Sequence, residues 1–243
     1  MSEPAKTRAE AAYARLRGEI LSGRLAPGSR LRAGVLNETY GLGLTPIREA
    51  CARLAAEHLV AAEGQRGFAV APVSVAELGD LIELRRQLET TALTRAIAQG
   101  DDAWEEGMVA AFHALTKVRV PRAGDGAAET ADWEAAHHRF HAALIGPGRS
   151  PWLLRVREQL DAQMERYRRL LMFQTPGATN SLAAEILAEH ASLLAEALGS
   201  AEHEAILRAA LDRDVARAES LMSAHLRRTA GLFELLGEAV LAA

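Results

Sequence analysis

The apolar residues that follow Gly43 recur at the spacing of a helix. One face of this segment carries Ile47, Ala50, Cys51, Leu54 and Ala55, which predicts a helix that buries this face. Thr45 is expected to cap the helix through its hydroxyl, and Pro46 suits the first helical position because an N–H there would have no partner. Arg48 and Arg53 lie away from the apolar face, so we expect both to face solvent.

Two short strands are predicted after this helix. The strand candidates are residues 59–61 and 68–70, and the turn between them contains Gly64, Arg66 and Gly67. Arg66 is expected at the tip of the turn, where an arginine can reach phosphates or a minor groove. A helix followed by such a hairpin is what a winged helix-turn-helix requires.

The rest of the chain shows helical periodicity. Residues 6–22 form an amphipathic helix, and residues 31–40 supply the first helix of the helix-turn-helix, with the turn at Gly41. After Ser74, a possible N-cap, we expect helices over 75–99, 102–118, 129–145, 150–173, 180–198, 201–210 and 213–237. The predicted fold is mainly α, with a winged helix-turn-helix domain over 1–73 and an all-helical bundle over 74–243.

The distribution of charge supports this division. The whole chain has a net charge of −4, which taken alone argues against nucleic acid. Residues 1–73, however, contain 10 Lys and Arg and 7 Asp and Glu, giving +3, whereas the remainder contains 18 and 25, giving −7. A weakly basic first domain fits DNA contact that is confined to that domain.

Cysteine content and hydropathy indicate the compartment. Cys51 is the single cysteine and lies on the apolar helix face, so we expect a buried structural thiol and no disulfide within the chain. The N-terminus lacks the apolar segment of a signal peptide, and no apolar run approaches the length of a membrane span. We therefore expect a cytoplasmic protein.

Three strings of the first domain resemble a known family. GRLAPGSRL from Gly23, TPIREACARL from Thr45 and HLVAAEGQRGFAV from His58 resemble, in order and spacing, the DNA-binding domain of GntR-family bacterial transcription regulators. The resemblance implies that the recognition helix enters the major groove of operator DNA. It further implies DNA contacts by Thr45, Arg48, Arg53 and Gly67.

One position departs from the family pattern. Gly43 and Leu44 stand where the family usually has Ser-Arg before the Thr-Pro. An arginine that commonly meets the operator is therefore absent. We expect a smaller salt-dependent part of DNA binding and a changed base preference.

The second domain resembles the FadR-type effector domain, the FCD domain, of one GntR subfamily. The strings that carry the resemblance are ELRRQLE from Glu83, HHRFHAAL from His137 and HEAILRAALDRDVARAESLMSAHL from His203. The resemblance implies a domain that binds a small organic acid and forms a homodimer.

Four histidines of this domain are candidates for a metal site. His137 and His141 are four residues apart on one predicted helix, and His203 and His225 lie on two consecutive helices that can run antiparallel. Four converging imidazoles would bind a divalent transition metal such as zinc or nickel. Buried core histidines with ordinary hydrogen bonds are the alternative.

The resemblance implies which of these histidines are ligands. His141, His203 and His225 match the family's three histidine positions, and His137 stands where an aspartate is expected. The substitution leaves three outcomes open: a retained metal, a shifted metal preference, or a domain that binds its ligand without metal. His190 is a spare candidate, and His138 points off the shared face.

Arg85 is the candidate effector-binding residue. The resemblance implies that an arginine on this helix meets an anionic effector, and a guanidinium beside a metal suits a small carboxylate. The alternative is an intrahelical ion pair with Glu89, one turn away. The basic patch at Tyr167, Arg168 and Arg169 is expected to be a solvated helix surface.

These observations favour a transcriptional repressor. One short recognition helix reads too few base pairs alone, so we expect a homodimer on double-stranded operator DNA with two half-sites. A small carboxylate effector would set the DNA affinity. A metal-responsive regulator is one alternative. A metal-dependent hydrolase is the other, and the lack of an HExxH motif or a clearly placed general base argues against an enzyme.

Overall fold

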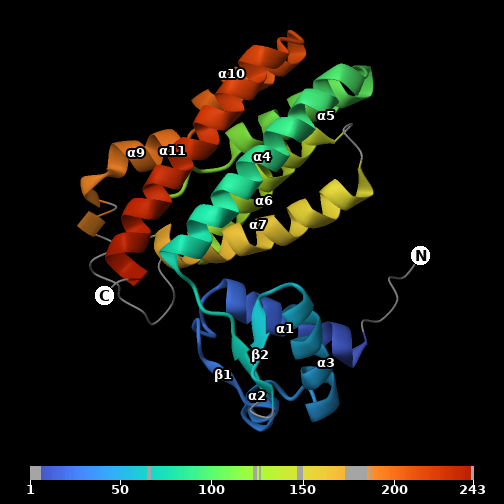
Figure 1. Ribbon diagram of the computed structural model, residues 1–243, viewed down its shortest axis with the longest axis vertical. Coiled ribbons are helices and arrows are strands. Elements are labelled where there is room, and N and C mark those ends of the chain that lie inside the picture. Colours follow the sequence, from blue (N-terminus) through green and yellow to red (C-terminus); the bar gives the residue numbers. More distant parts are fainter. Residues whose placement is uncertain are drawn as a thin grey trace. The chain divides into compact units, whose positions relative to one another are not determined.

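The chain folds into two compact units. The computed structural model describes residues 7–64, 67–122, 125, 127–146, 150–172, 185–186 and 188–241. The division between the units lies between Val73 and Ser74 (Figure 1). The predicted mainly helical fold, with a small wing in the first unit and an all-helical second unit, is confirmed.

The first unit is a helix-turn-helix with a small antiparallel sheet. Its elements are α1 (Arg8–Leu21), β1 (Arg30–Leu31), α2 (Ala33–Tyr40), α3 (Leu44–Ala56), β2 (Val60–Ala62) and β3 (Phe68–Val70). The strand order is β1-β3-β2, and Ala69 of β3 is paired with Arg30 on one side and Ala61 on the other. Leu16, Ile47 and Leu54 are completely buried where α1 packs on α3.

Strand β1 was not predicted from the sequence. Leu31 pairs with Phe68 of the wing and is buried, so the first helix of the helix-turn-helix begins at Ala33 and not at residue 31. A strand of two residues leaves no alternating pattern to detect, and only its pairing with β3 defines it.

The predicted cap of α3 is wrong. The helix begins at Leu44, and its N-cap is Gly43, whose φ of 90° and ψ of 145° turn the chain sharply into the helix. Thr45 is therefore the second helical residue, and no side chain of the described residues caps this end. Pro46 becomes the third helical residue and is still tolerated, because the first four N–H groups of a helix have no intrahelical partner.

Cys51 is buried on α3, as predicted, and is not in a disulfide. Burial raises the pKa of its thiol to about 11. The thiol therefore stays protonated at neutral pH and is a packing group of the core.

The second unit is a bundle of helices. Its helices, among the described residues, are α4 (Val75–Gln99), α5 (Asp102–Lys117), α6 (Ala127–Ile145), α7 (Pro151–Met172), α9 (Ala191–Leu198), α10 (Ser200–Leu211) and α11 (Val215–Leu241). Ser74 caps α4, because its hydroxyl accepts a hydrogen bond from the N–H of Glu77 at 3.1 Å. Much of the predicted helix over 180–198 lies outside the described residues. In the part of the chain that the structure covers, no helix is long and apolar enough to cross a membrane.

The packing of the bundle brings distant segments of the chain together. Helix α4 packs along α11 and also contacts α6 and α7, and α10 contacts both α5 and α11 (Figure 1). Helices α6, α10 and α11 therefore surround one interior region with α4. The histidines singled out from the sequence lie on α6, α10 and α11.

Candidate functional sites: a recognition helix and a buried histidine cluster

The solvent-facing side of α3 carries two of the predicted DNA-binding residues near its start. Thr45 and Arg48 are exposed, whereas Ile47 and Cys51 face the core. Among the residues that the structure describes, Arg48 has no ion-pair partner, so its guanidinium is available to another molecule. In helix-turn-helix proteins the first residues of the second helix contact base edges.

Arg53 lies farther along α3 and is held against α1. Its guanidinium stacks 4.0 Å from the centre of the Tyr13 ring. The hydroxyl of Tyr13 in turn donates a hydrogen bond to Glu57 Oε1 at 2.6 Å. Stacking uses the face of the guanidinium and leaves the N–H groups at its edge for a phosphate.

The wing turn is closed by backbone hydrogen bonds. The N–H of Glu63 donates to the carbonyl of Gly67 at 2.8 Å, and the N–H of Gly67 donates to the carbonyl of Gly64 at 3.3 Å. Gly64 and Gly67 have φ values of 57° and 89°, which favour glycine. Arg66 lies outside the described residues, so its role stays a prediction.

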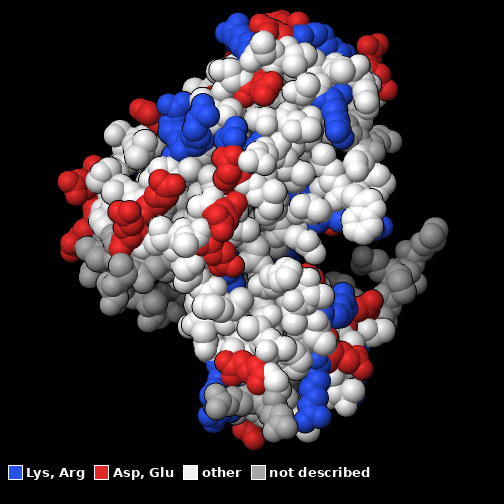
Figure 2. Space-filling model, in the orientation of Figure 1, with Lys and Arg blue, Asp and Glu red and all other residues white. Residues whose placement is uncertain are grey.

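Arg32 is a further DNA-contact candidate that was not predicted from the sequence. Arg32 is the N-cap residue of α2, is exposed, and has no ion-pair partner in the described part of the first unit. A helix N-terminus with an arginine attracts phosphate. On the face in view, the first unit shows basic and acidic side chains next to one another (Figure 2).

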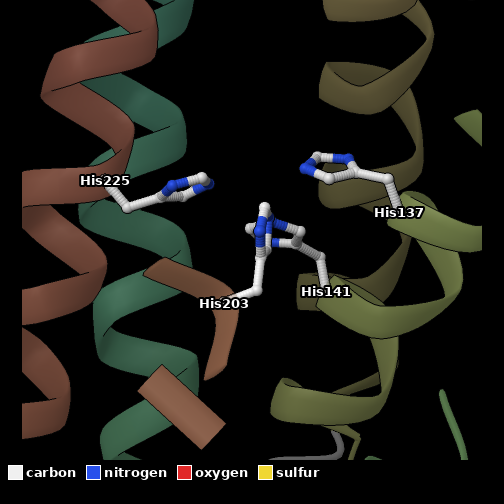
Figure 3. A group of neighbouring side chains, drawn as sticks. All are labelled: His137, His141, His203 and His225. Carbon is white, nitrogen blue, oxygen red and sulfur yellow. The ribbon is translucent and has the colours of Figure 1, made fainter. Parts of the chain in front are cut away.

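The second unit brings the four predicted metal-binding histidines together. The rings of His137 and His141 from α6, His203 from α10 and His225 from α11 point toward one another (Figure 3). All four are buried, and one nitrogen from each lies within 4.8 Å of the others. His190 is not in this cluster, because it precedes α9 and its Nδ1 hydrogen-bonds to the carbonyl of Ile186 at 3.0 Å.

Hydrogen bonds orient three of these rings. Each Nδ1 faces an oxygen acceptor: Glu89 Oε2 at 3.1 Å for His141, the carbonyl of Gly199 at 2.7 Å for His203, and Glu202 Oε2 at 2.8 Å for His225. A proton on each Nδ1 satisfies these acceptors and leaves the Nε2 lone pair without a proton. The Nε2 atoms of His141 and His203 are buried and have no hydrogen-bond partner among the described residues.

The fourth ring is positioned by stacking. His137 lies 4.6 Å from the ring of Trp133 with an interplanar angle of 19°, and its centre is 4.5 Å from that of His141 and 5.0 Å from that of His203. The position at which the family resemblance implies an aspartate therefore contributes an imidazole to the cluster. His138, next to it, is exposed and faces Asp161, as its position off the shared helix face predicted.

Burial keeps three of these histidines, His137, His141 and His203, uncharged. It lowers the pKa of His137 and of His203 well below the usual value, and neighbouring positive charges add to the effect. Burial also lowers the pKa of His141 to about 4, although Glu89 acts in the opposite direction. These imidazoles are neutral at pH 7, which is the form that binds a metal.

Arg85 lies next to this cluster and is paired with Glu89. Its Nε donates to Glu89 Oε1 at 2.7 Å, and both side chains are buried. Burial alone would raise the pKa of Glu89, but Arg85 and His141 outweigh it and hold that pKa well below its usual range. The intrahelical pair that the sequence left open is thus present, and it connects Arg85 to His141 through one carboxylate.

The prediction that Tyr167, Arg168 and Arg169 form a solvated surface is wrong. Tyr167 is completely buried, and Arg169 makes two hydrogen bonds to Glu134 Oε2, at 2.9 and 2.6 Å. Arg168 is mostly buried, and its Nε, 3.7 Å from Glu134 Oε1, has no hydrogen-bond partner among the described residues. Charged residues occupy the buried face of α7, so the periodicity of apolar residues could not reveal that face.

Tyr167 also anchors the start of the second unit. Its hydroxyl donates to Glu77 Oε2 at 2.6 Å and accepts a hydrogen bond from the N–H of Ser74 at 3.0 Å. Burial and Glu77 raise the pKa of the phenol to about 12, so it stays protonated and able to donate. Helix α7 is thereby joined to the residue that follows the unit boundary.

Comparison with known proteins agrees with both units. The sequence model of the bacterial regulatory proteins of the gntR family matches residues 8–70, and that of the FCD domain matches residues 80–228. The chain belongs to the GntR family. It is therefore a DNA-binding transcriptional regulator with an FCD domain, and the relatives described next are regulators too, not enzymes.

Two relatives are similar over most of their length. This GntR regulator is 34% identical over 214 residues to the HTH-type transcriptional repressor GlaR of Escherichia coli (strain K12). The aligned region covers 88% of this chain and 90% of GlaR. The chain is also 34% identical over 228 residues to the HTH-type transcriptional regulator BphR of Paraburkholderia xenovorans (strain LB400), covering 94% of this chain and 86% of the relative.

Solved structures agree with the fold. E. coli McbR/YncC aligns with a TM-score of 0.67 at 20% identity, over 94% of this chain and 97% of that one. A GntR regulator from Rhodococcus sp. RHA1 aligns with a TM-score of 0.64 at 18% identity, over 94% and 98% of the two chains. At such identities the likeness concerns the fold alone.

We predict that Arg48→Ala weakens binding to the promoter beside the protein's own gene by about 5- to 150-fold for each recognition helix, because a good side-chain contact to a base is worth about 1–3 kcal/mol. Fluorescence anisotropy at fixed salt measures this change. Arg139→Ala, an exposed arginine of α6, is the control and should bind as the parent does. Parent-like affinity of a folded Arg48→Ala protein would contradict the assignment of α3.

Proposed function

We propose that this protein is a homodimeric repressor whose operator affinity is controlled by a small carboxylate effector, bound beside a divalent metal ion. The observation that carries the proposal is the buried cluster of four histidines with two unpartnered Nε2 atoms. Buried polar atoms without a partner are costly, and in a folded protein they call for a ligand or another specific explanation.

The residues fit a transition metal. His137, His141, His203 and His225 would hold it through nitrogen atoms, which suit zinc and nickel. Glu89 and Glu202 accept hydrogen bonds from the Nδ1 atoms of His141 and His225, on the side of each ring opposite Nε2. Carboxylates commonly orient metal-binding histidines in this way. A bound metal ion would act as a Lewis acid and could coordinate a carboxylate oxygen of the effector.

The charge of the site favours an anionic effector. Imidazole ligands bring no negative charge, whereas an aspartate in place of His137 would bring one. The charge of a bound divalent ion therefore stays uncompensated by its ligands, and a carboxylate restores the balance.

Two arginines are available to orient the effector. Arg85 uses its Nε for Glu89, and the remaining N–H groups of a guanidinium can still donate. Arg168 has a buried Nε without a partner, and its charge adds to the lowering of the His137 pKa, so it lies near the cluster. An arginine can bind a carboxylate through two hydrogen bonds.

Helix α7 offers a physical route from the effector to the DNA-binding unit. Arg168 lies beside the histidine cluster, and the neighbouring Tyr167 is bonded to Ser74 at the unit boundary. An effector acts on DNA affinity only if it binds two arrangements of the protein unequally. A shift of α7 on effector binding would distinguish two such arrangements.

The direction of regulation and the oligomeric state rest on the family and on DNA geometry. The E. coli relative GlaR is named a transcriptional repressor, which supports repression. A homodimer is supported because a single α3 reads few base pairs, and two-fold related helices match two half-sites.

We expect purified protein to retain about one zinc or nickel ion per chain, as a single four-ligand site requires. His141→Ala and His203→Ala should lose most of this metal, and Glu89→Gln should weaken its binding by about 10- to 100-fold because the support of His141 is removed. Elemental analysis after dialysis measures the content. His113→Ala, an exposed histidine of α5, is the control. Equal and negligible metal in every sample would contradict the proposal.

We expect at least one small carboxylic or sugar acid to raise the melting temperature of the metal-loaded protein. Arg168→Met should weaken binding of that acid by roughly 10- to 150-fold, since a hydrogen bond to a charged group contributes about 1.5–3 kcal/mol. Arg155→Met, on the exposed side of the same helix, is the matched control. If DNA affinity follows zinc or nickel concentration without any acid, the metal-responsive alternative holds instead.

We expect the protein in solution to have twice the 26.1 kDa mass of one chain. Sedimentation equilibrium at micromolar concentration measures the mass, and titration with operator DNA measures the number of chains bound. A monomer in solution and one chain on each operator would exclude the homodimer.

A further inference from the structure

The structure gives Leu44 an unusual position for an aliphatic residue. Its side chain is 48% exposed, although it is the first residue of α3 and the core residue Ile47 follows within the same turn. Exposed leucines are common, so exposure alone carries no argument. Leu44 is distinguished by its place at the start of α3 on the DNA-binding unit.

The turn before α3 places Leu44 rigidly. Gly43 adopts a φ of 90°, and its N–H donates to Asn37 Oδ1 on α2 at 2.6 Å. The start of α3 is thus tied to the other helix of the helix-turn-helix. Leu44 therefore belongs to the first turn of a helix whose start is hydrogen-bonded to α2.

Leu44 shares its helix face with Arg48. The two residues are four apart, so their side chains are neighbours on the surface of α3. Thr45 and Arg48 are exposed as well, and together the three form the start of the helix that enters the major groove in helix-turn-helix proteins. Leu44 therefore faces the DNA wherever Arg48 does.

The chemistry of the side chain selects its target. Leucine can neither donate nor accept a hydrogen bond and cannot pair with a phosphate. The apolar group that the major groove offers is the C5-methyl of thymine. We propose that Leu44 contacts a thymine methyl group in each half-site and so sets a thymine preference in the operator.

Deoxyuridine provides a direct test, because it differs from thymidine by this methyl alone. The operator is first selected from a pool of random DNA duplexes, and each thymine of the selected site is then replaced by deoxyuridine. We expect parent protein to lose about fourfold in affinity for each half-site at one symmetry-related position, which corresponds to roughly 0.8 kcal/mol for one buried methyl group. Leu44→Ala should bind the two DNAs equally.

Two further variants separate this contact from other effects. Leu44→Arg should lose the discrimination between thymine and uracil and gain a steeper salt dependence, because a new phosphate or base contact adds charge. Val109→Ala, an exposed aliphatic residue of α5, should keep the parent's discrimination. Alanine favours helix, so Leu44→Ala is expected to fold normally.

The proposal depends on α3 as the recognition helix, which Arg48→Ala tests separately. If Arg48→Ala weakens binding as predicted but parent protein binds thymine and uracil equally at every position, Leu44 does not read a methyl group and the proposal is overturned. It is also overturned if Leu44→Ala retains the parent's discrimination.

Discussion

The buried hydrogen-bonded series from Arg85 through Glu89 to His141 is the interaction on which the histidine cluster depends. The two bonds measure 2.7 and 3.1 Å, and the Glu89 side chain is completely buried. A buried carboxylate without partners would be strongly destabilising, so Arg85 makes it possible for Glu89 to remain ionised inside the bundle. Glu89 then fixes the His141 ring with its Nε2 toward the other histidines.

Buried charged side chains also occur on the inner face of α7. Arg157 lies 3.2 Å from Asp161, Arg169 is bonded to Glu134, and Arg168 has an unpartnered Nε. Because Tyr167 bonds to Ser74, α7 and the start of the second unit are physically connected.

Particular residues show how far the sequence allowed prediction. The spacing of His137 and His141 placed two rings on one helix face, and the position of His203 and His225 on two consecutive helices added two more. The bundle does bring these four rings together. Strand β1, the start of α3 at Leu44 and the burial of Arg168 were not predicted. Each depends on a contact outside its own element: Phe68 for Leu31, Asn37 on the preceding helix for Gly43, and the interior of the bundle for Arg168.

The sequence by itself determined the order of the two units, the helical periodicity of the apolar residues and the exposure of the arginines on α3. It also showed that His137 stands where the family resemblance implies an aspartate. These features depend on local spacing and residue type, which the chain carries directly. Only the tertiary structure decided that Arg85 supports His141 through Glu89, that Arg168 is buried, and that Leu44 remains exposed. Burial and hydrogen-bond partners are set by segments that meet only after folding, so no local pattern records them.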